Sequence, residues 1–125
     1  MIAYSTVPTN DMEQARKFYD QLLGDMGAKV VMERPDGGFV AYGDGKGPMF
    51  GICKPWNGEP ASPGNGNMVS IACSGPDQVK AMYDKAIALG ATDEGPAGPR
   101  LNGMCSCGYV RDADGNKLNF FCMGA

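Results

Sequence analysis

The sequence repeats one order of secondary-structure elements twice: a strand, an amphipathic helix and then three more strands. Phe18-Tyr19-Asp20 in the first helical stretch corresponds to Met82-Tyr83-Asp84 in the second, 64 residues further along, and the same offset aligns Tyr4 with Met68. Such a repeat constrains the fold strongly, because each copy must bury its own helix against its own strands. A chance match is the alternative, since many α+β sequences carry one helix per half. We predict an α+β fold of two β-α-β-β-β modules that form an open barrel around a cavity.

The first half of the chain contains every element of the repeat. Asn10 is a candidate N-cap with Glu13 three residues later, as in a capping box, and apolar residues then recur at helical spacing until Gly24. Alternating or β-rich stretches surround this helix, with glycine-containing turns between them. The expected strands are Ile2–Val7, Ala28–Met32, Phe39–Tyr42 and Met49–Cys53.

A stretch rich in Pro, Gly and Asn separates the two halves. We predict a single domain, residues 1–125, with module 1 at about 1–54, a linker at 55–66 and module 2 at about 67–125. In the second helix Ser74 is a candidate N-cap, Pro76 lies in the first turn and Gly90 ends the helix. The expected strands are Met68–Cys73, a short one within the weakly patterned residues 91–100, Met104–Arg111 and Lys117–Cys122.

The chain contains no histidine, which removes the commonest general base near neutral pH and the commonest transition-metal ligand. This excludes a catalytic triad built on a histidine of this chain. The net charge is −3 without a basic cluster, so we expect no nucleic-acid partner. The chain shows no apolar stretch of the roughly 18 residues that a membrane span needs and no signal peptide. We therefore expect no membrane partner, a cytoplasmic location and five reduced cysteines.

Two groups of residues, taken in their order and spacing, resemble the vicinal oxygen chelate superfamily of glyoxalases, bleomycin-resistance proteins and extradiol dioxygenases. The first group is Tyr4, Asn10-Asp11-Met12, Phe18-Tyr19 and Leu23-Gly24, which looks like the opening strand and helix of that family. The second is the run from Val110 to Leu118 (VRDADGNKL), which stands where the family has its closing hairpin. The resemblance covers nearly the whole chain and implies a glyoxalase-like fold.

The resemblance also implies a position for a divalent metal, which chelates two adjacent oxygens of a substrate. Its ligands in the family lie on the first and last strands of each module, and these positions correspond to Tyr4, Met68, Asn119 and, approximately, Phe50. A phenol, a thioether, a carboxamide and a phenyl ring do not replace imidazoles and a carboxylate around such an ion. A divalent metal is thus the family expectation, but these residues predict no metal site and no cofactor.

Strand alternation predicts which side chains share a sheet face and line the cavity. We expect a largely apolar wall with few hydrogen-bonding groups, which suits a small, partly aromatic ligand; a filled sheet core is the alternative. Trp56, in the linker, is expected either to cover the cavity mouth or to anchor a loop. The candidate ligand-binding residues are Tyr4, Phe50, Trp56, Met68, Cys105, Cys107, Tyr109, Asn119 and Phe121.

Cys105 and Cys107 are two residues apart on one predicted strand, so their thiols should face the same way. Their Cα atoms are then about 6.5–7 Å apart, at the upper limit for a disulfide. A closed zinc site needs four ligands, and the other cysteines provide no second pair. Ordinary strand cysteines are the favoured interpretation, with soft Cu(I) or a reactive thiol as the alternatives.

Three functions fit these observations. The first is a metal-free binding protein for a small, partly aromatic molecule. The second is an enzyme related to lactoylglutathione lyases, isomerases or dioxygenases with an atypical site, for which Tyr4, Cys107 and Tyr109 are the candidate catalytic groups. The third is a subunit whose cleft contacts another protein. In each case the resemblance implies a homodimer.

Overall fold

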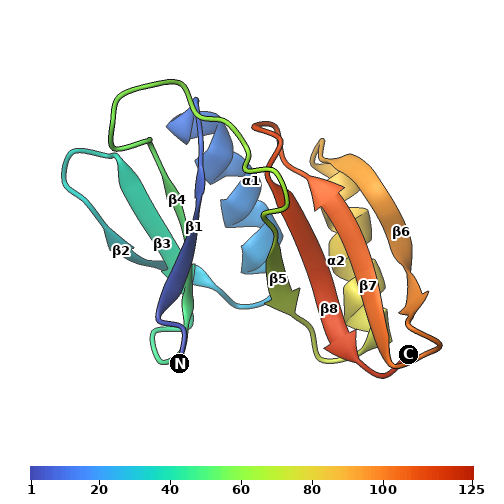
Figure 1. Cartoon of the computed structure of the whole chain (residues 1–125). Helices are drawn as coiled ribbons and strands as arrows, with labels where there is room; N and C mark the ends of the chain where they lie inside the picture. The colour runs from blue at the N-terminus through green and yellow to red at the C-terminus, as the bar shows by residue number, and fades with distance from the viewer. The chain divides into compact units, whose positions relative to one another are not determined.

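The two halves of the chain fold separately into the same order of elements (Figure 1). The computed structural model describes residues 1–125, which divide into two compact units, Met1–Pro63 (module 1) and Gly64–Ala125 (module 2). The division falls inside the predicted linker. Module 1 contains β1 (Tyr4–Pro8), α1 (Met12–Gly24), β2 (Lys29–Glu33), β3 (Phe39–Gly43) and β4 (Met49–Cys53). Module 2 contains β5 (Val69–Ala72), α2 (Pro76–Ala88), β6 (Thr92–Arg100), β7 (Cys105–Arg111) and β8 (Lys117–Met123).

Each module forms one mixed sheet of four strands with the same topology. The order is β1-β4-β3-β2 in module 1 and β5-β8-β7-β6 in module 2. The first strand of each module pairs in parallel with its last strand, and the other neighbours are antiparallel. The two helices begin 64 residues apart, at Met12 and Pro76, which is the offset of the sequence repeat. The predicted α+β class and the two β-α-β-β-β modules are confirmed.

The N-cap residue of each helix lies one position later in the chain than predicted. The N-cap of α1 is Asp11, whose Oδ1 accepts the Gln14 backbone N–H at 3.0 Å, so the prediction of Asn10 is wrong. Asn10 instead bonds the backbone of Ala61 with both side-chain polar atoms. The N-cap of α2 is Gly75, which has no side-chain cap, and Ser74 uses its backbone N–H to reach the Gln78 side chain. Asn and Asp are both favourable N-cap residues, so the sequence alone does not distinguish Asn10 from Asp11; the path of the backbone selects Asp11.

Both helices end on the same backbone arrangement. The N–H of Ala28 bonds Leu23 O, and the N–H of Ala91 bonds Ala86 O, which are the long bonds of a Schellman motif. The residue before each of these donors has positive φ, 78° at Gly27 and 104° at Gly90. Glycine reaches this conformation without the steric cost of a Cβ atom, so these two glycines fix where the chain leaves each helix.

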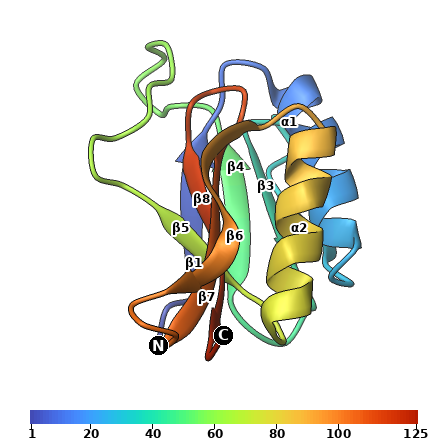
Figure 2. The same cartoon turned by 90° about the vertical axis from the view of Figure 1, so that its right-hand side faces the viewer.

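One face of each sheet packs against the helix of its own module. In module 1, Tyr19 of α1 contacts Phe50 and Tyr42, with ring centroids 4.9 and 6.5 Å apart. In module 2, Gly108 of β7 lies so close to α2 that a Cβ there would be 3.1 Å from Tyr83 Cβ. The remaining core includes the buried side chains of Val7, Leu22, Leu23, Val40 and Ile52 in module 1 and of Val79, Met82, Ala86, Val110, Leu118 and Phe120 in module 2. Figure 2 shows α2 over one face of the module 2 sheet.

The stretch that was weakly patterned in sequence, residues 91–100, is a long strand. β6 spans nine residues and pairs with β7, with register shifts between Asp93 and Gly95 and between Gly95 and Gly98. These irregularities break the two-residue alternation, which explains why the sequence predicted only one short strand there. The other strand ends match the predictions or differ from them by one or two residues, and β4 matches at both ends.

The closing motif of the resemblance is a structural turn. Asp112, which is buried, accepts the backbone N–H groups of Asp114 and Asn116 on Oδ1 and the Asn116 side chain on Oδ2. Gly115 has φ 86° within this turn. These bonds hold β7 and β8 in register, so the DADGN run serves the fold of module 2.

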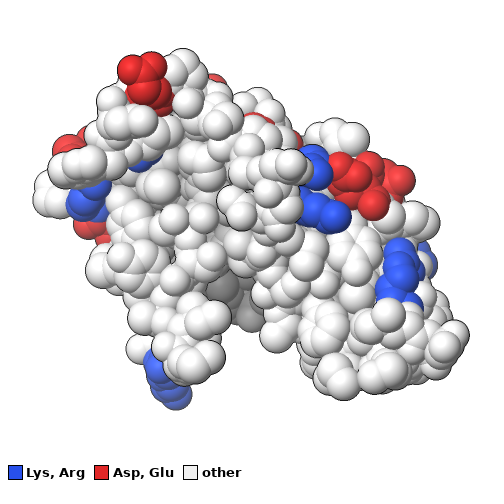
Figure 3. Space-filling model, viewed as in Figure 1, with Lys and Arg blue, Asp and Glu red and all other residues white.

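Charged side chains are few on the face seen in Figure 3 and form small separate groups. Exposed ion pairs join Arg16 to Glu33, Arg34 to Asp36, Lys80 to Asp84 and Arg111 to Glu94. Neither of the two 13-residue helices is long and apolar enough to cross a membrane.

The cap of α1 can be tested by substitution. Replacing Asp11 with Ala should lower the free energy of unfolding by about 1 kcal/mol, because the Gln14 N–H loses its acceptor. Asp11→Ser should recover most of this loss, since serine is also a favourable N-cap. Urea unfolding followed by circular dichroism measures both, and equal stability of Asp11→Ala and the parent chain would contradict the assignment.

Candidate functional site

The face of the module 2 sheet that points away from α2 carries five of the predicted site residues. Because Gly108 faces α2, strand alternation places Cys105, Cys107 and Tyr109 on the opposite face of β7. Strand pairing sets Tyr109 directly across from Asn119 and Cys107 across from Phe121. We call this surface, defined by these five residues, the helix-free face of module 2. The predicted alternation of β7 and of β8 therefore agrees with the strand pairing, and ligand binding by these residues stays a prediction.

The Tyr109 ring contacts two cations. The Arg100 guanidinium carbon is 5.6 Å from the ring centroid, and the Lys117 ammonium nitrogen is 5.2 Å from it. Arg100 is held in place by hydrogen bonds to the carbonyls of Pro96, Gly98 and Pro99. Lys117 follows the turn and precedes the buried Leu118, so its position over the ring comes from the strand. The two cations attract the negative face of the phenol ring and fix its orientation.

Asn119 is the buried polar residue at the centre of this face. It is 3% exposed, and its Nδ2 donates to Ser70 Oγ of β5 at 3.1 Å. Its Oδ1 is fully buried and has no hydrogen-bond partner. Buried carbonyl oxygens are normally paired, because leaving one unpaired costs about 1–3 kcal/mol. Asn119 thus presents an unused acceptor at a position the sequence had already assigned to the ligand site.

In module 1 the structure separates two residues that we expected to share a face. Tyr4 is half-exposed and contacts Phe39 edge to face, with ring centroids 5.9 Å apart. Phe50 packs on Tyr19 of α1 and therefore faces the helix, so its placement beside Tyr4 is wrong. In the parallel pairing, the β4 residues that share the face of Tyr4 and Thr6 are their direct partners, Met49 and Gly51. A one-residue slip in an alignment moves a strand side chain to the other face.

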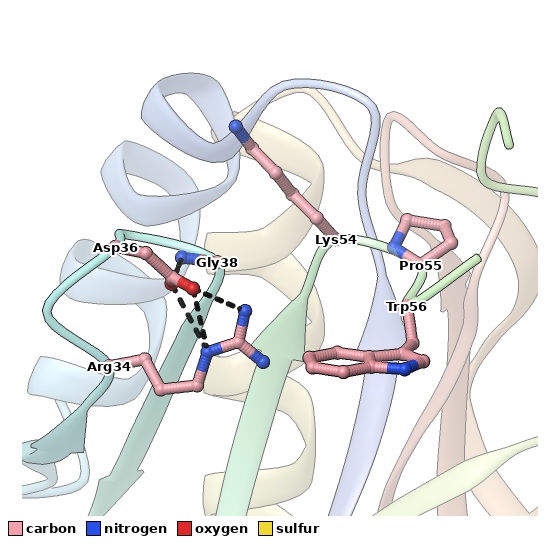
Figure 4. A pocket seen from close by; sticks show the side chains of 6 residues that line it. All are labelled: Arg34, Asp36, Gly38, Lys54, Pro55 and Trp56. Carbon is pink, nitrogen blue, oxygen red and sulfur yellow. Dashed lines mark hydrogen bonds and ion pairs between the residues drawn. The ribbon is translucent and has the colours of Figure 1, made fainter. Parts of the chain in front are cut away.

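Trp56 lies in a pocket formed by module 1 alone. The pocket has a volume of about 320 Å³ and is lined by Arg34, Asp36, Gly38, Lys54, Pro55 and Trp56. The Arg34 guanidinium stacks on the indole, 5.2 Å from its centroid, and binds Asp36 at 2.8–3.2 Å (Figure 4). This hydrogen bond lowers the pKa of Asp36 and raises that of Arg34.

A Cβ at Gly38 would lie 2.6 Å from Arg34 Nη2, so glycine there permits the approach of the guanidinium. Lys54 extends away from the indole in Figure 4. Because Asp36 balances the charge of Arg34, the pocket provides a stacking surface more than an anion site. The contact supports a loop-anchoring role for Trp56, which is 88% exposed. The sequence analysis did not select Arg34, Asp36 or Lys54 as site residues, although all three lie next to the turn-forming residues Pro35, Gly37 and Pro55.

Two ionisable groups on the helix-free face of module 2, the phenol of Tyr109 and the thiol of Cys105, have raised pKa values. A hydrogen bond with Cys107 and loss of solvation raise the pKa of Tyr109. Burial, followed by the neighbouring Cys107 thiol, raises the pKa of Cys105. A protonated phenol and thiol donate hydrogen bonds but do not act as a base or a thiolate nucleophile near neutral pH.

The comparisons with known proteins agree with this fold. Residues 1–120 match the model of the Glyoxalase/Bleomycin resistance protein/Dioxygenase superfamily, and the chain belongs to this family. No curated protein matches the chain.

Several solved structures are similar along nearly the whole chain. A glyoxalase/bleomycin resistance protein from Albidiferax ferrireducens T118 is 36% identical with a TM-score of 0.86, and the match covers 97% of each chain. A glyoxalase-related enzyme from Fulvimarina pelagi is 21% identical with a TM-score of 0.73, covering 97% of this chain and 86% of that one. TioX from Micromonospora sp. ML1 is 18% identical with a TM-score of 0.69, covering 98% of both. The last two comparisons concern the fold alone.

The residues at the family's metal positions do not fit a divalent ion. Module 1 supplies the phenol of Tyr4, while Phe50 faces its helix; module 2 supplies the thioether of Met68 and the amide of Asn119. Hard and borderline ions prefer carboxylates and imidazoles, and no group of three His, Cys, Asp or Glu side chains in the chain is placed to hold one. We derive no chemistry through a divalent metal at these positions.

Two buried asparagines of module 2 offer a matched test of the unpaired oxygen. Asn119→Leu should leave the free energy of unfolding unchanged or raise it by up to about 1 kcal/mol, since it removes an unpaired buried carbonyl. Asn116→Leu should lower it by about 1–3 kcal/mol, because the Oδ2 of the buried Asp112 carboxylate loses the side-chain donor of Asn116. Denaturant unfolding compares them, and an equally large loss in both variants would show that Asn119 is satisfied in solution.

Proposed function

We propose that this chain is a ligand-binding member of its family that takes up a small, partly aromatic molecule on the helix-free face of module 2, without the family's divalent metal. The observation that carries this proposal is the buried, unpaired Oδ1 of Asn119. A ligand that donates an N–H or O–H to this oxygen relieves a desolvation cost of about 1–3 kcal/mol, which adds directly to its affinity.

The neighbours of Asn119 favour a ligand that has a flat apolar ring next to its N–H or O–H donor. Phe121 and Tyr109 are partly exposed; Tyr109 is the cross-strand partner of Asn119, and Phe121 is the next residue along β8 on the same face. Ser70, whose Oγ accepts a hydrogen bond from the Asn119 amide, is solvent-exposed, so the Asn119 side chain adjoins a surface residue. Aromatic rings with one polar group are the ligands that such a mostly apolar site recognises.

The alternative of an enzyme with an atypical site receives no support from these groups. Tyr109 and Cys105 have raised pKa values, so neither is prepared to accept a proton or attack as a thiolate. Tyr4 lies on the other module, where its ring packs edge to face against Phe39. Cys107 has a thiol and a phenol as its neighbours, without a base.

Indole and 1-methylindole test the proposal, because they differ only in the N–H donor. Indole added to protein treated with EDTA should shift the amide NMR signals of β7 and β8, and 1-methylindole should bind about tenfold more weakly, the equivalent of one hydrogen bond to a buried acceptor. Asn119→Leu should bind indole no better than 1-methylindole. Addition of Mn²⁺ or Ni²⁺ should change none of these affinities.

Equal affinity for the two compounds, or binding that appears only with Mn²⁺ or Ni²⁺, would overturn the proposal. Asn65→Leu is the control for a change of residue type, since Asn65 is exposed and lies before β5. That variant should bind both compounds as the parent chain does.

We also propose, from the family resemblance, that the chain is a homodimer in solution. Light scattering coupled to size exclusion should then give about twice the chain mass of 13.2 kDa. A monomer mass at all accessible concentrations would contradict the dimer but would not affect the indole test.

A further inference from the structure

We propose that Cys105, Cys107 and Met123 form a binding site for a soft monovalent metal ion, Cu⁺, on module 2. This site is distinct from the family's divalent position and does not depend on the proposed indole-type ligand. It rests on three sulfur-bearing side chains that the pairing of β7 with β8 brings to one sheet face.

The two thiols are already at the separation that a shared metal requires. Their sulfur atoms are 3.8 Å apart, and all five cysteines of the chain are free. With metal–sulfur bonds of about 2.3 Å, this separation corresponds to a sulfur–metal–sulfur angle of about 110°. An ion can therefore bridge the pair with little movement of the strand. The bent angle leaves a coordination position open on the side away from both sulfurs.

Met123 supplies a third sulfur for that position. It is the direct cross-strand partner of Cys105, so the two side chains project from the same face with Cβ atoms about 4.5–5.5 Å apart. The side chain is 72% exposed and long, and its thioether is free to swing over the thiol pair. Methionine sulfur binds soft ions and discriminates against hard ones.

The surroundings of the pair favour a soft ion over zinc or a harder cation. Cys105 is 5% exposed and Cys107 is 3% exposed, so the sulfurs are shielded from water. No third His, Cys, Asp or Glu completes a group around them, whereas a closed zinc site needs four such ligands. Thiolate and thioether together select Cu⁺. On binding, two Cu–S bonds replace two S–H bonds, the protons leave to solvent, and copper stays in the +1 state.

The test is a titration of the reduced protein with Cu⁺ under anaerobic conditions, in competition with the coloured Cu⁺ chelator bicinchoninate. The parent chain should hold one equivalent. Cys105→Ser and Cys107→Ser should each weaken binding by at least about tenfold, the scale on which even outer partners of a metal site act. Cys73→Ser, at a half-buried cysteine that follows β5, should bind as the parent does.

Two exposed methionines provide a matched pair for the third ligand. Met123→Leu should keep the stoichiometry and weaken the affinity several-fold, while Met104→Leu, next to Cys105 but before the strand, should change neither. Asn119→Leu should also keep full Cu⁺ binding, so loss of the indole-type site is distinguishable from loss of this one.

X-ray absorption spectroscopy of the copper-loaded parent protein identifies the atoms bound to copper, and its result does not depend on whether the variants fold. We expect a first coordination shell of sulfur alone. A shell of nitrogen or oxygen, or one equivalent of Cu⁺ retained by the Cys105→Ser/Cys107→Ser double variant, would overturn the site. Unchanged affinity in Met123→Leu would overturn the third ligand.

Discussion

The packing of one helix on one face of each four-stranded sheet is the constraint on which the rest of the structure depends. Tyr19 against Phe50 does this in module 1, and the close approach of Tyr83 to Gly108 does it in module 2. These contacts use the apolar half of every strand, since strand side chains alternate between faces. The side chains on the opposite face of each sheet remain available for binding or chemistry, and these side chains differ between the two modules.

In module 2 that second face carries only a few polar groups. It carries an amide with one unpaired oxygen, a phenol in contact with two cations, and a pair of thiols, but no carboxylate that faces them in the pairing. Burial and mutual hydrogen bonds keep the phenol and the Cys105 thiol protonated. Groups of this kind recognise a ligand by shape and hydrogen bonding or bind a soft ion; proton transfer requires a group that titrates near neutral pH.

The sequence predicted whole elements better than single residues. Apolar spacing located both helices, and strand alternation grouped Cys105, Cys107, Tyr109, Asn119 and Phe121 correctly, because both patterns follow from local geometry. It failed where one residue of register decides the outcome. Asn10 and Asp11 are both acceptable caps, and Phe50 and Gly51 are adjacent on one strand, so local preference cannot choose between neighbours that only the parallel pairing with β1 distinguishes.

The sequence by itself determined the repeat, the fold class and the absence of histidine, which together limit the chemistry available to this chain. Only the tertiary structure decided that Asn119 has an oxygen without a partner, that two thiols lie 3.8 Å apart with a methionine opposite, and that Arg34 stacks on Trp56. The physical reason is distance along the chain. Periodicity reflects the geometry of a few consecutive residues. Whether a buried oxygen finds a partner, and which side chain lies opposite a thiol, depends on the register between paired strands, which are separate segments of the chain.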